Sequence, residues 1–267
     1  MDQQIYEKIV KKKEFSNLPK KDVELAFSKF DHERYLDEEK VKFTRDALRK
    51  IFSVFASNKI LSLKDKDAEW ILKKHFSSRE RLPYYEKIYS RILKSHETPG
   101  QVPKKVSIID LGAGVNGFSY DYFEKVGCKV DYVGVEAMGQ LAMVMDNYFK
   151  KNKISAKAIH ESLFELDKIR KIIEKTSPNG VKPRIVFLFK VFDSLEMLER
   201  NYSKKLLLEF VPIVDKVVIS FATRSLVNRK KFLAQRKWLT NFIEDKFNVL
   251  DDFEIGGERY ICFEKQR

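Results

Sequence analysis

Residues 108–117 read IIDLGAGVNG, an apolar run that leads into a glycine-rich turn. Such a turn after a buried strand is typical of a nucleotide-cofactor site, because glycines let the backbone approach the ligand closely. Gly112, Gly114 and Gly117 fit the dinucleotide pattern G-x-G-x-x-G, and Glu136 follows about 20 residues later, where a ribose-binding acid belongs. Asp110 favours another cofactor, since the first strand of S-adenosylmethionine (SAM) enzymes usually ends in an acid before the glycines. The stretch alone leaves both NAD and SAM open.

Strands and helices alternate through the chain on both sides of this turn. Short apolar strands are expected at 106–110, 130–135, 156–160, 184–189 and 216–221. Helices are expected after them at 118–126, 139–151, 166–175, 195–213 and 230–246. This alternation predicts an α/β fold with a parallel, doubly wound sheet.

The alternation stops after the last of these helices. Two further strands are expected at 248–254 and 259–264, and the link at 255–258 is too short for a parallel crossover but suits a hairpin. A parallel sheet closed by a terminal antiparallel hairpin is the plan of the Rossmann-like class I SAM-dependent methyltransferase fold, which has seven strands. Together with Asp110, the hairpin favours SAM over NAD.

The part of the chain before the sheet is expected to be all helical. Apolar residues recur at helical spacing in 20–30 and 41–55, and residues 1–96 show no alternating strand pattern. Residues 97–105 contain Pro99, Gly100 and Pro103 and read as a linker. We therefore expect an N-terminal helical domain at 1–96, a linker at 97–105 and a methyltransferase domain at 106–267.

Charge and composition narrow the class of protein. Lysine and arginine outnumber aspartate and glutamate by 52 to 39, and the formal charge of +13 suits a polyanionic partner such as nucleic acid. No apolar run approaches the roughly 18–20 residues of a membrane span, and the N-terminus lacks a signal-peptide pattern. We expect a cytoplasmic protein without a membrane partner. Cys128 and Cys262 are expected to be buried thiols, and no metal site is expected.

Acidic and hydroxyl side chains follow the second and third expected strands, at the edge where a doubly wound sheet binds its ligand. Glu136 is placed to accept hydrogen bonds from both ribose hydroxyls, and Glu161 and Ser162 are placed near the adenine. Each acid has a structural alternative. Glu136 could be a solvated cap, and Glu161 could simply begin the next helix.

Five segments, in order along the chain, carry a resemblance to a known family. They are HFSSRERL at 75–82, GAGVN at 112–116, LFK at 188–190 with Leu195 and Leu198, SFATRSL at 220–226 and IGGE at 255–258. They are similar to the H-x-S-T-x-E-R, G-C-G-x-N, strand-four, S-F-P-T-R-S-L and final-turn segments of one family. The chain resembles the 16S ribosomal RNA guanine-N7 methyltransferases that confer aminoglycoside resistance. The similarity also includes residues 9–13 with Asn17 and Leu18, and it covers nearly the whole chain.

The resemblance implies methyl transfer from SAM to N7 of a guanine in the decoding A-site region of the small (30S) ribosomal subunit. Guanine N7 carries an in-plane lone pair and no proton, so the attack needs no general base. We therefore assign no catalytic residue, and Lys190 is the nearest candidate for an active-site polar group. A lysine at a strand end could instead pair with a neighbouring carboxylate. A monomer is expected.

The family pattern also implies which residues bind the cofactor. Arg81 is expected to pair with the methionine carboxylate, since its planar guanidinium can form two parallel hydrogen bonds. Its alternative is an ion pair with Glu80 or Glu86. The full set of expected cofactor residues is Arg81, Asp110, Gly112, Ala113, Gly114, Asn116, Glu136, Ala137, Glu161, Ser162, Phe189 and Lys190.

Two basic clusters are expected to contact RNA. The first follows the fifth strand and comprises Arg224, Ser225, Arg229, Lys230, Lys231, Arg236 and Lys237. It would bind phosphates at the cofactor mouth and position the target base. The second lies in the helical domain and comprises Lys11, Lys12, Lys13, Lys20 and Lys21. It would recognise RNA by shape, although such a run is also typical of a solvated face.

The chain departs from the family pattern at several positions. The segment after Leu226 lacks the family's glycines and is about two residues shorter, and Gly117 stands where the family has proline. Residues 137–138 replace a more polar pair. These changes leave a SAM site in place but put the RNA position in doubt. Methylation of another RNA, or a non-catalytic RNA-binding role, therefore remains an alternative. Gly117 is expected to complete the dinucleotide pattern by coincidence.

Overall fold

The computed structural model of the chain describes residues 1–53, 67–94, 101–176, 183–224 and 236–266. Helices fill the part before the sheet, as expected. They are α1 (Gln3–Val10), α2 (Lys20–Ser28), α3 (Asp37–Leu48), the π-helical η1 (Arg49–Ser53), α5 (Ala68–Lys74), α6 (Phe76–Arg81), the 3₁₀ turn η2 (Leu82–Tyr84) and α7 (Tyr85–Ile92).

Seven strands form one mixed sheet. They are β1 (Lys105–Leu111), β2 (Lys129–Glu136), β3 (Ala156–His160), β4 (Arg184–Phe189), β5 (Lys216–Ala222), β6 (Phe247–Ile255) and β7 (Glu258–Lys265). Their order is β3-β2-β1-β4-β5-β7-β6. The first five strands run parallel, and β7 pairs antiparallel with both β5 and β6. The parallel sheet and the terminal hairpin are confirmed, and this is the SAM-dependent methyltransferase fold.

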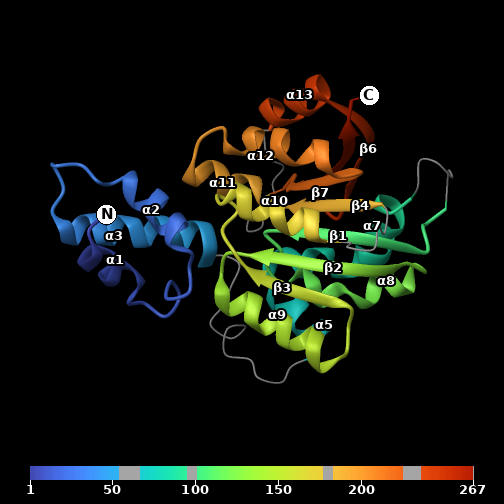
Figure 1. The fold of residues 1–267 in the computed structure, drawn as a ribbon, viewed down its shortest axis with the longest axis horizontal. Coiled ribbons are helices and arrows are strands. Elements are labelled where there is room, and N and C mark those ends of the chain that lie inside the picture. Colours follow the sequence, from blue (N-terminus) through green and yellow to red (C-terminus); the bar gives the residue numbers. More distant parts are fainter. Residues whose placement is uncertain (54–66, 95–100, 177–182, 225–235, 267) are drawn as a thin grey trace.

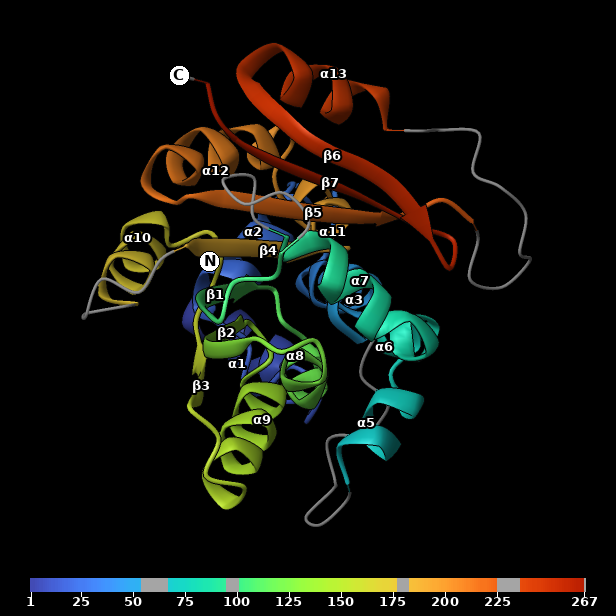
Figure 2. The same ribbon diagram turned by 90° about the vertical axis from the view of Figure 1, so that its right-hand side faces the viewer.

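Helices cover both faces of the sheet. The elements between the strands are η3 (Asn116–Ser119), α8 (Asp121–Lys125), α9 (Gly139–Lys151), α10 (Leu166–Lys175), α11 (Phe192–Leu198), α12 (Tyr202–Phe210), η4 (Val211–Ile213) and α13 (Lys237–Lys246). Figure 2 shows α7, α8 and α9 on one side of the sheet and α10 and α12 on the other. Within the described residues, no helix is long and apolar enough to cross a membrane.

The single helix expected at 195–213 is wrong, because the chain breaks there into α11 and α12. Asn201 adopts a left-handed conformation with φ +63°, which no α-helix continues. Glu196 stabilises the break, since its carboxylate accepts from the N–H groups of Asn201 at 2.6 Å and Ser203 at 2.9 Å. The capping of α12 thus comes from the preceding helix. The helix expected at 118–126 is likewise shorter, with η3 before α8.

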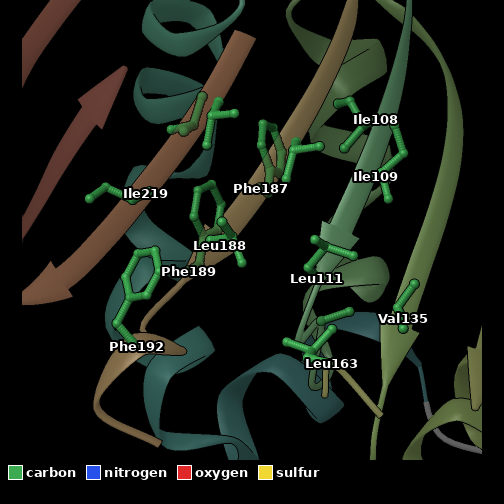
Figure 3. Packing of buried hydrophobic residues seen from close by; sticks show 14 of the residues in the cluster. Ile108, Ile109, Leu111, Val135, Leu163, Phe187, Leu188, Phe189, Phe192 and Ile219 are labelled. Atoms are coloured by element: carbon green, nitrogen blue, oxygen red, sulfur yellow. The ribbon is translucent and has the colours of Figure 1, made fainter. Parts of the chain in front are cut away.

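The core lies between the sheet and these helices. Figure 3 shows Phe187, Leu188 and Phe189 of β4 packed between β1 and Ile219 of β5. Strand β1 is buried from Val106 to Leu111, as expected for a central parallel strand covered on both faces. Helix α7 joins this core, because the Tyr89 ring stacks on Phe123 with centroids 4.0 Å apart. The domain boundary near residue 96 therefore stays a prediction, since packing crosses it.

Helices α1–α3 form a lobe that stands beside the sheet (Figure 1). We call residues 1–53 the N-terminal lobe. Its connection to the sheet region passes through Asn17, whose carbonyl accepts from the N–H of Gly139 at 3.0 Å at the start of α9. A Cβ on Gly139 would lie 2.9 Å from the Cβ of Asn17, so the lobe sits directly on the first residue of α9.

Gly117 serves packing in this fold. A Cβ at this position would lie 2.5 Å from Sδ of Met145 and 2.6 Å from Cζ of Phe149 on α9. Met145 also packs against Gly134 of β2, where an added Cβ would lie 2.8 Å from Cε of Met145. The two glycines thus let α9 approach β2 and η3.

We expect Gly117→Ala to lower the free energy of unfolding by about 1–3 kcal/mol, because the added methyl overpacks this contact. Urea unfolding followed by circular dichroism measures the change. In a Met145→Ala background, which lacks two of the three nearest atoms, Gly117→Ala should cost less than it does in the wild type. A variant as stable as the wild type would contradict the packing role.

Candidate functional site

A cavity opens at the carboxyl ends of β1, β2 and β4. It contains about 880 Å³ of space not filled by atoms, part of it open to solvent. Its walls come from the glycine turn, the ends of three strands, α11 and the helices before the sheet. Ten of the twelve expected cofactor residues line it: Arg81, Asp110, Gly112, Ala113, Gly114, Asn116, Glu136, Ala137, Phe189 and Lys190.

The glycine turn takes a conformation that other residues adopt only with strain. Gly112 and Gly114 have φ values of +74° and +55°, in the left-handed region. A Cβ on Gly112 would also lie 2.7 Å from Cγ2 of Val191. The N–H groups of Gly112 and Ala113 both donate to the carbonyl of Val135. The turn is therefore fixed against β2 and presents bare backbone to the cavity.

Glu136 ties the turn to the end of β2. One carboxylate oxygen accepts from the N–H of Gly114 at 2.8 Å, and the other accepts from the N–H of Met138 at 2.8 Å. The residue is 7% exposed, so the alternative of a solvated cap is wrong. Burial raises the pKa of Glu136, and the two N–H donors oppose this shift. Glu136 therefore lines the cavity with a buried carboxylate, and a backbone N–H fixes the position of each of its oxygens.

Asn116 connects the end of β1 to the helices before the sheet. Its amide nitrogen donates to Oδ2 of Asp110 at 2.7 Å, and its oxygen accepts from Nη1 of Arg81 at 3.2 Å and from the hydroxyl of Tyr85 at 3.0 Å. Asp110 also accepts from the hydroxyl of Tyr132 at 2.8 Å. Burial raises the pKa of Asp110, although both donors lower it. One amide thus holds the acid and the arginine in fixed positions.

Arg81 and Lys190 share a buried carboxylate from the terminal hairpin. Nε of Arg81 donates to both oxygens of Glu258 at 3.1 and 3.0 Å, and Nζ of Lys190 lies 3.1 Å from Oε2 of the same residue. Arg81 also lies over the ring of Phe189, 5.0 Å from its centroid. Lys190 makes a second ion pair with Glu80 at 2.8 Å. We call Arg81, Lys190, Glu258 and Glu80 the buried ion cluster.

The expected alternative partners of Arg81 are therefore wrong. Glu80 pairs with Lys190, and Glu86 lies 3.8 Å from Lys125. The partner of Arg81 is Glu258, at 2% exposure, with Ser220 also donating to it. Burial pulls the pKa of Glu258 upward, but the charges of Arg81 and Lys190 outweigh this and hold it below its usual value.

Two further residues of this site were not predicted. Glu258 begins β7 in the IGGE segment, but its partner is 177 positions away, so no local pattern connects them. His75 directly precedes α6 and caps it, because its Nδ1 accepts from the N–H of Ser78 at 3.4 Å and lies 3.0 Å from Oγ of the same serine. Burial, with the nearby charges of Arg81 and Lys190, lowers the pKa of His75 to about 3, so its ring is neutral.

Glu161 and Ser162 are not among the described residues that line the cavity. The carboxylate of Glu161 accepts from the N–H of Ser162 at 3.0 Å and pairs with Lys168 at 3.4 Å, the arrangement of a local helix-start residue. Ser162 is fully buried and its hydroxyl accepts from the N–H of Phe164 at 3.0 Å. Their expected place beside the adenine stays a prediction.

The structure describes part of the two basic clusters. Ser225, Arg229, Lys230 and Lys231 lie outside the described residues. Arg224 and Lys237 are exposed, whereas Arg236 pairs with Asp193 and donates to the carbonyl of Ala222 at 2.9 Å. In the N-terminal lobe, the side chains of Lys11, Lys12, Lys13, Lys20 and Lys21 are exposed.

The two cysteines have no part in the site. Cys128 and Cys262 are free and buried, as predicted. Burial raises their pKa values to about 11 and about 12, so neither is a thiolate nucleophile at neutral pH. Among the described residues, no group of three or more His, Cys, Asp and Glu could hold a metal ion.

A model of the family described as "Ribosomal RNA methyltransferase (FmrO)" matches residues 35–261 of this chain. The chain belongs to this ribosomal RNA methyltransferase family. The match begins within the N-terminal lobe, just before α3, ends within β7 and includes most of the cavity wall. The resemblance seen in the sequence is confirmed at the level of the family.

Other members of the ribosomal RNA methyltransferase group are similar in sequence or structure. The 16S rRNA (guanine(1405)-N(7))-methyltransferase of Proteus mirabilis is 24% identical over 198 residues, 71% of this chain and 62% of the relative. The match thus spans less than two thirds of that relative.

Two solved structures superpose over 100% of both chains with TM-scores of 0.74: RmtF in complex with S-adenosyl-L-homocysteine, at 17% identity, and the 16S rRNA methylase RmtB, at 18%. At these identities the superposition shows the common fold.

Proposed function

We propose that this chain transfers a methyl group from SAM to N7 of a guanine in 16S rRNA, in the decoding region of the 30S subunit. The observation that carries the proposal is the cavity at the carboxyl ends of β1, β2 and β4, whose wall combines the glycine turn, Glu136, Arg81 and Lys190 in a member of this family. The name of the Proteus mirabilis relative supports the choice of guanine N7. Methylation at the decoding site would give aminoglycoside resistance.

The residues present fit SAM at both ends. Oδ1 of Asp110 is buried, lines the cavity and has no hydrogen-bond partner within the described ranges, so it would accept from the ammonium group of the methionine part. Arg81 and Lys190 bring positive charge for the carboxylate. A guanidinium has five N–H donors, and Glu258 and Asn116 engage Nε and Nη1. Glu136 would take the ribose hydroxyls.

The chemistry requires positioning more than proton transfer. When bound, SAM supplies an electrophilic methyl group on a sulfonium. The N7 lone pair of guanine lies in the ring plane and carries no proton, so no side chain has to act as a base. The polar groups around the cavity are held by one another, and fixed placement of the reactants is itself a large contribution to rate. Lys190 is held in the cavity wall by ion pairs with Glu80 and Glu258, and its positive charge would lie close to the bound cofactor.

The substrate is an assembled particle, and the charge of the protein suits it. The exposed lysines of the N-terminal lobe and the basic residues that follow β5 in the sequence would contact RNA phosphates. A monomer in the cytoplasm is sufficient for this reaction. The alternative substrate, another rRNA position or a tRNA, differs only in which RNA these surfaces recognise.

Incubation with purified 30S subunits and SAM labelled in its methyl group tests the proposal. We expect label in 16S rRNA at a single guanine. Borohydride reduction and aniline cleavage then map the base, because N7 methylation makes the strand labile there. Glu136→Ala is the matched inactive control. Label appearing only in another RNA would select the alternative substrate, and absence of label from every RNA would favour a non-catalytic RNA-binding factor.

A further inference from the structure

An acidic side chain of the N-terminal lobe lies in the wall of the same cavity. Asp22 stands in the first turn of α2 and is 2% exposed. It lines the cavity together with Glu136, although its helix belongs to the lobe beside the sheet (Figure 1). The chemistry proposed above gives this carboxylate no role.

The surroundings of Asp22 leave its charge uncompensated. The charged groups that face it are the carboxylates of Glu136 on β2 and Glu161 after β3, and the phenol of Tyr202 on α12 is also close. A hydrogen bond with Ser162 favours the ionised form. Oδ2 is buried and has no hydrogen-bond partner within the part of the chain that the structure describes. Burial, reinforced by the two acids, raises the pKa of Asp22 to about 7.

A buried carboxylate with an unsatisfied oxygen is unfavourable for the folded protein. The start of α2 offsets part of this cost, because a helix N-terminus carries partial positive charge. This partial charge gives Oδ2 of Asp22 no hydrogen-bond partner among the described residues. A perturbed acid in a cleft with an unpaired oxygen is typical of a ligand-binding position. Asp22 therefore calls for a ligand that brings its own hydrogen-bond donor.

We propose that Asp22 accepts a hydrogen bond from the exocyclic N6 amine of the adenine of SAM, so that the N-terminal lobe forms part of the cofactor site. This inference rests on the function proposed above. The methionine end is assigned to the side of Arg81, and Glu136 takes the ribose hydroxyls. Ser162, which is bonded to Asp22, follows β3, where the adenine is expected. Once the ribose hydroxyls are assigned to Glu136, the N6 amine is the remaining hydrogen-bond donor of the adenosine part.

The cavity that Asp22 lines suits a flat aromatic base. Apolar side chains from both the sheet region and the lobe contribute to its wall: Ile51, Phe52, Met138, Leu141, Leu163 and Phe164. A base bound among them buries its two faces against carbon, which favours binding. Its polar edge then needs acceptors, because a buried donor without a partner is costly.

Removal of the amine from the ligand and of the carboxylate from the protein tests the contact as a double-mutant cycle. The two ligands are S-adenosylhomocysteine and its purine-riboside analogue, in which hydrogen replaces the N6 amine. We expect the wild type to bind the analogue about tenfold more weakly or worse, since hydrogen bonds to charged groups contribute most. Asp22→Ala is expected to bind both ligands alike. Titration calorimetry at about pH 8, where Asp22 is ionised, measures the four affinities.

Glu24→Ala is the matched control, because Glu24 lies on the same helix and pairs with Lys20 at the surface. It is expected to keep the wild-type preference for the amine. If Asp22→Ala also keeps that preference, the inference is wrong while the proposed function stands. If the wild type fails to bind S-adenosylhomocysteine, both are wrong.

The stability of the ligand-free protein gives a second readout. The pKa of Asp22 is raised from 3.8 to about 7 in the folded state, so between these values the folded protein holds a proton that the unfolded chain has lost. Wild-type stability therefore falls as the pH rises through this window, and Asp22→Ala lacks that contribution. At about pH 8 the variant is expected to melt at or above the wild-type temperature. A variant that melts well below it would mark Asp22 as a structural residue and overturn the inference.

Discussion

Glu258→Gln is expected to lower the free energy of unfolding by about 3–5 kcal/mol, the usual cost of removing one partner from a buried ion pair. The amide leaves Arg81, at 4% exposure, without a carboxylate, and it leaves Lys190 with Glu80 alone. Urea unfolding followed by circular dichroism measures the loss. The size of the effect reflects the loss of the one buried carboxylate that Arg81 and Lys190 share.

The matched control for this variant lies on the same hairpin. Asp252→Asn breaks the ion pair of Asp252 with Arg259, whose side chains are 34% and 29% exposed. We expect it to cost less than about 1 kcal/mol, as other solvated pairs do. Equal losses for the two variants would contradict the central role of Glu258.

Acid gives a further check on the same variant. Because the pKa of Glu258 is lowered in the folded protein, its stabilising contribution is complete above the unfolded value of 4.5 and is lost as the pH falls below it. The stabilities of the wild type and Glu258→Gln are therefore expected to converge in acid. A difference that stays constant across this range would point to lost packing.

Glu136→Ala is expected to weaken the binding of S-adenosylhomocysteine by about 100-fold or more. Each carboxylate oxygen accepts one backbone N–H and retains a lone pair for a ribose hydroxyl. Two hydrogen bonds to a buried charged acceptor contribute about 1.5–3 kcal/mol each. Titration calorimetry measures the affinity, and thermal unfolding shows whether the glycine turn still folds once Gly114 has lost its acceptor.

Glu161→Gln provides the comparison, since Glu161 follows the neighbouring strand but binds Ser162 and Lys168 in place of the cavity. A change of no more than a few fold is expected. A loss of affinity for S-adenosylhomocysteine as large as that of Glu136→Ala would indicate that Glu161 binds the adenine. It would then weaken the assignment of Asp22.

Features fixed by nearby residues could be predicted from the sequence. The strands of the sheet, the terminal hairpin and the glycine turn depend on local apolar patterns and turn residues, and all three are present. Asp110, Gly114 and Asn116 lie within seven positions of one another, so their shared cavity wall follows from one turn. The fold and the carboxyl-end location of the site were accessible for this reason.

Features that depend on distant packing could not be predicted. Glu258 binds Arg81 and Lys190 from β7, and Asp22 lines the cavity from the N-terminal lobe. Neither position differs locally from any exposed acid. The break before α12 depends on Glu196 turning back to cap it, which apolar periodicity does not record. Glu161 shows the opposite situation. Its position after β3 was predicted from the sequence, but its carboxylate accepts from the N–H of the adjacent Ser162, which the sequence did not indicate.

The buried ion cluster has a consequence for the order of folding. Arg81 precedes the sheet and Glu258 begins its seventh strand, so their pair closes a separation of 177 positions. Contacts of such span form late, because the chain must first lose the entropy of closing the loop. Until β7 pairs with β5, Arg81 and Lys190 lack the carboxylate of Glu258, which holds both cations at the cavity. A ribosome that synthesises this chain therefore meets no competent enzyme before the terminal hairpin has emerged and docked.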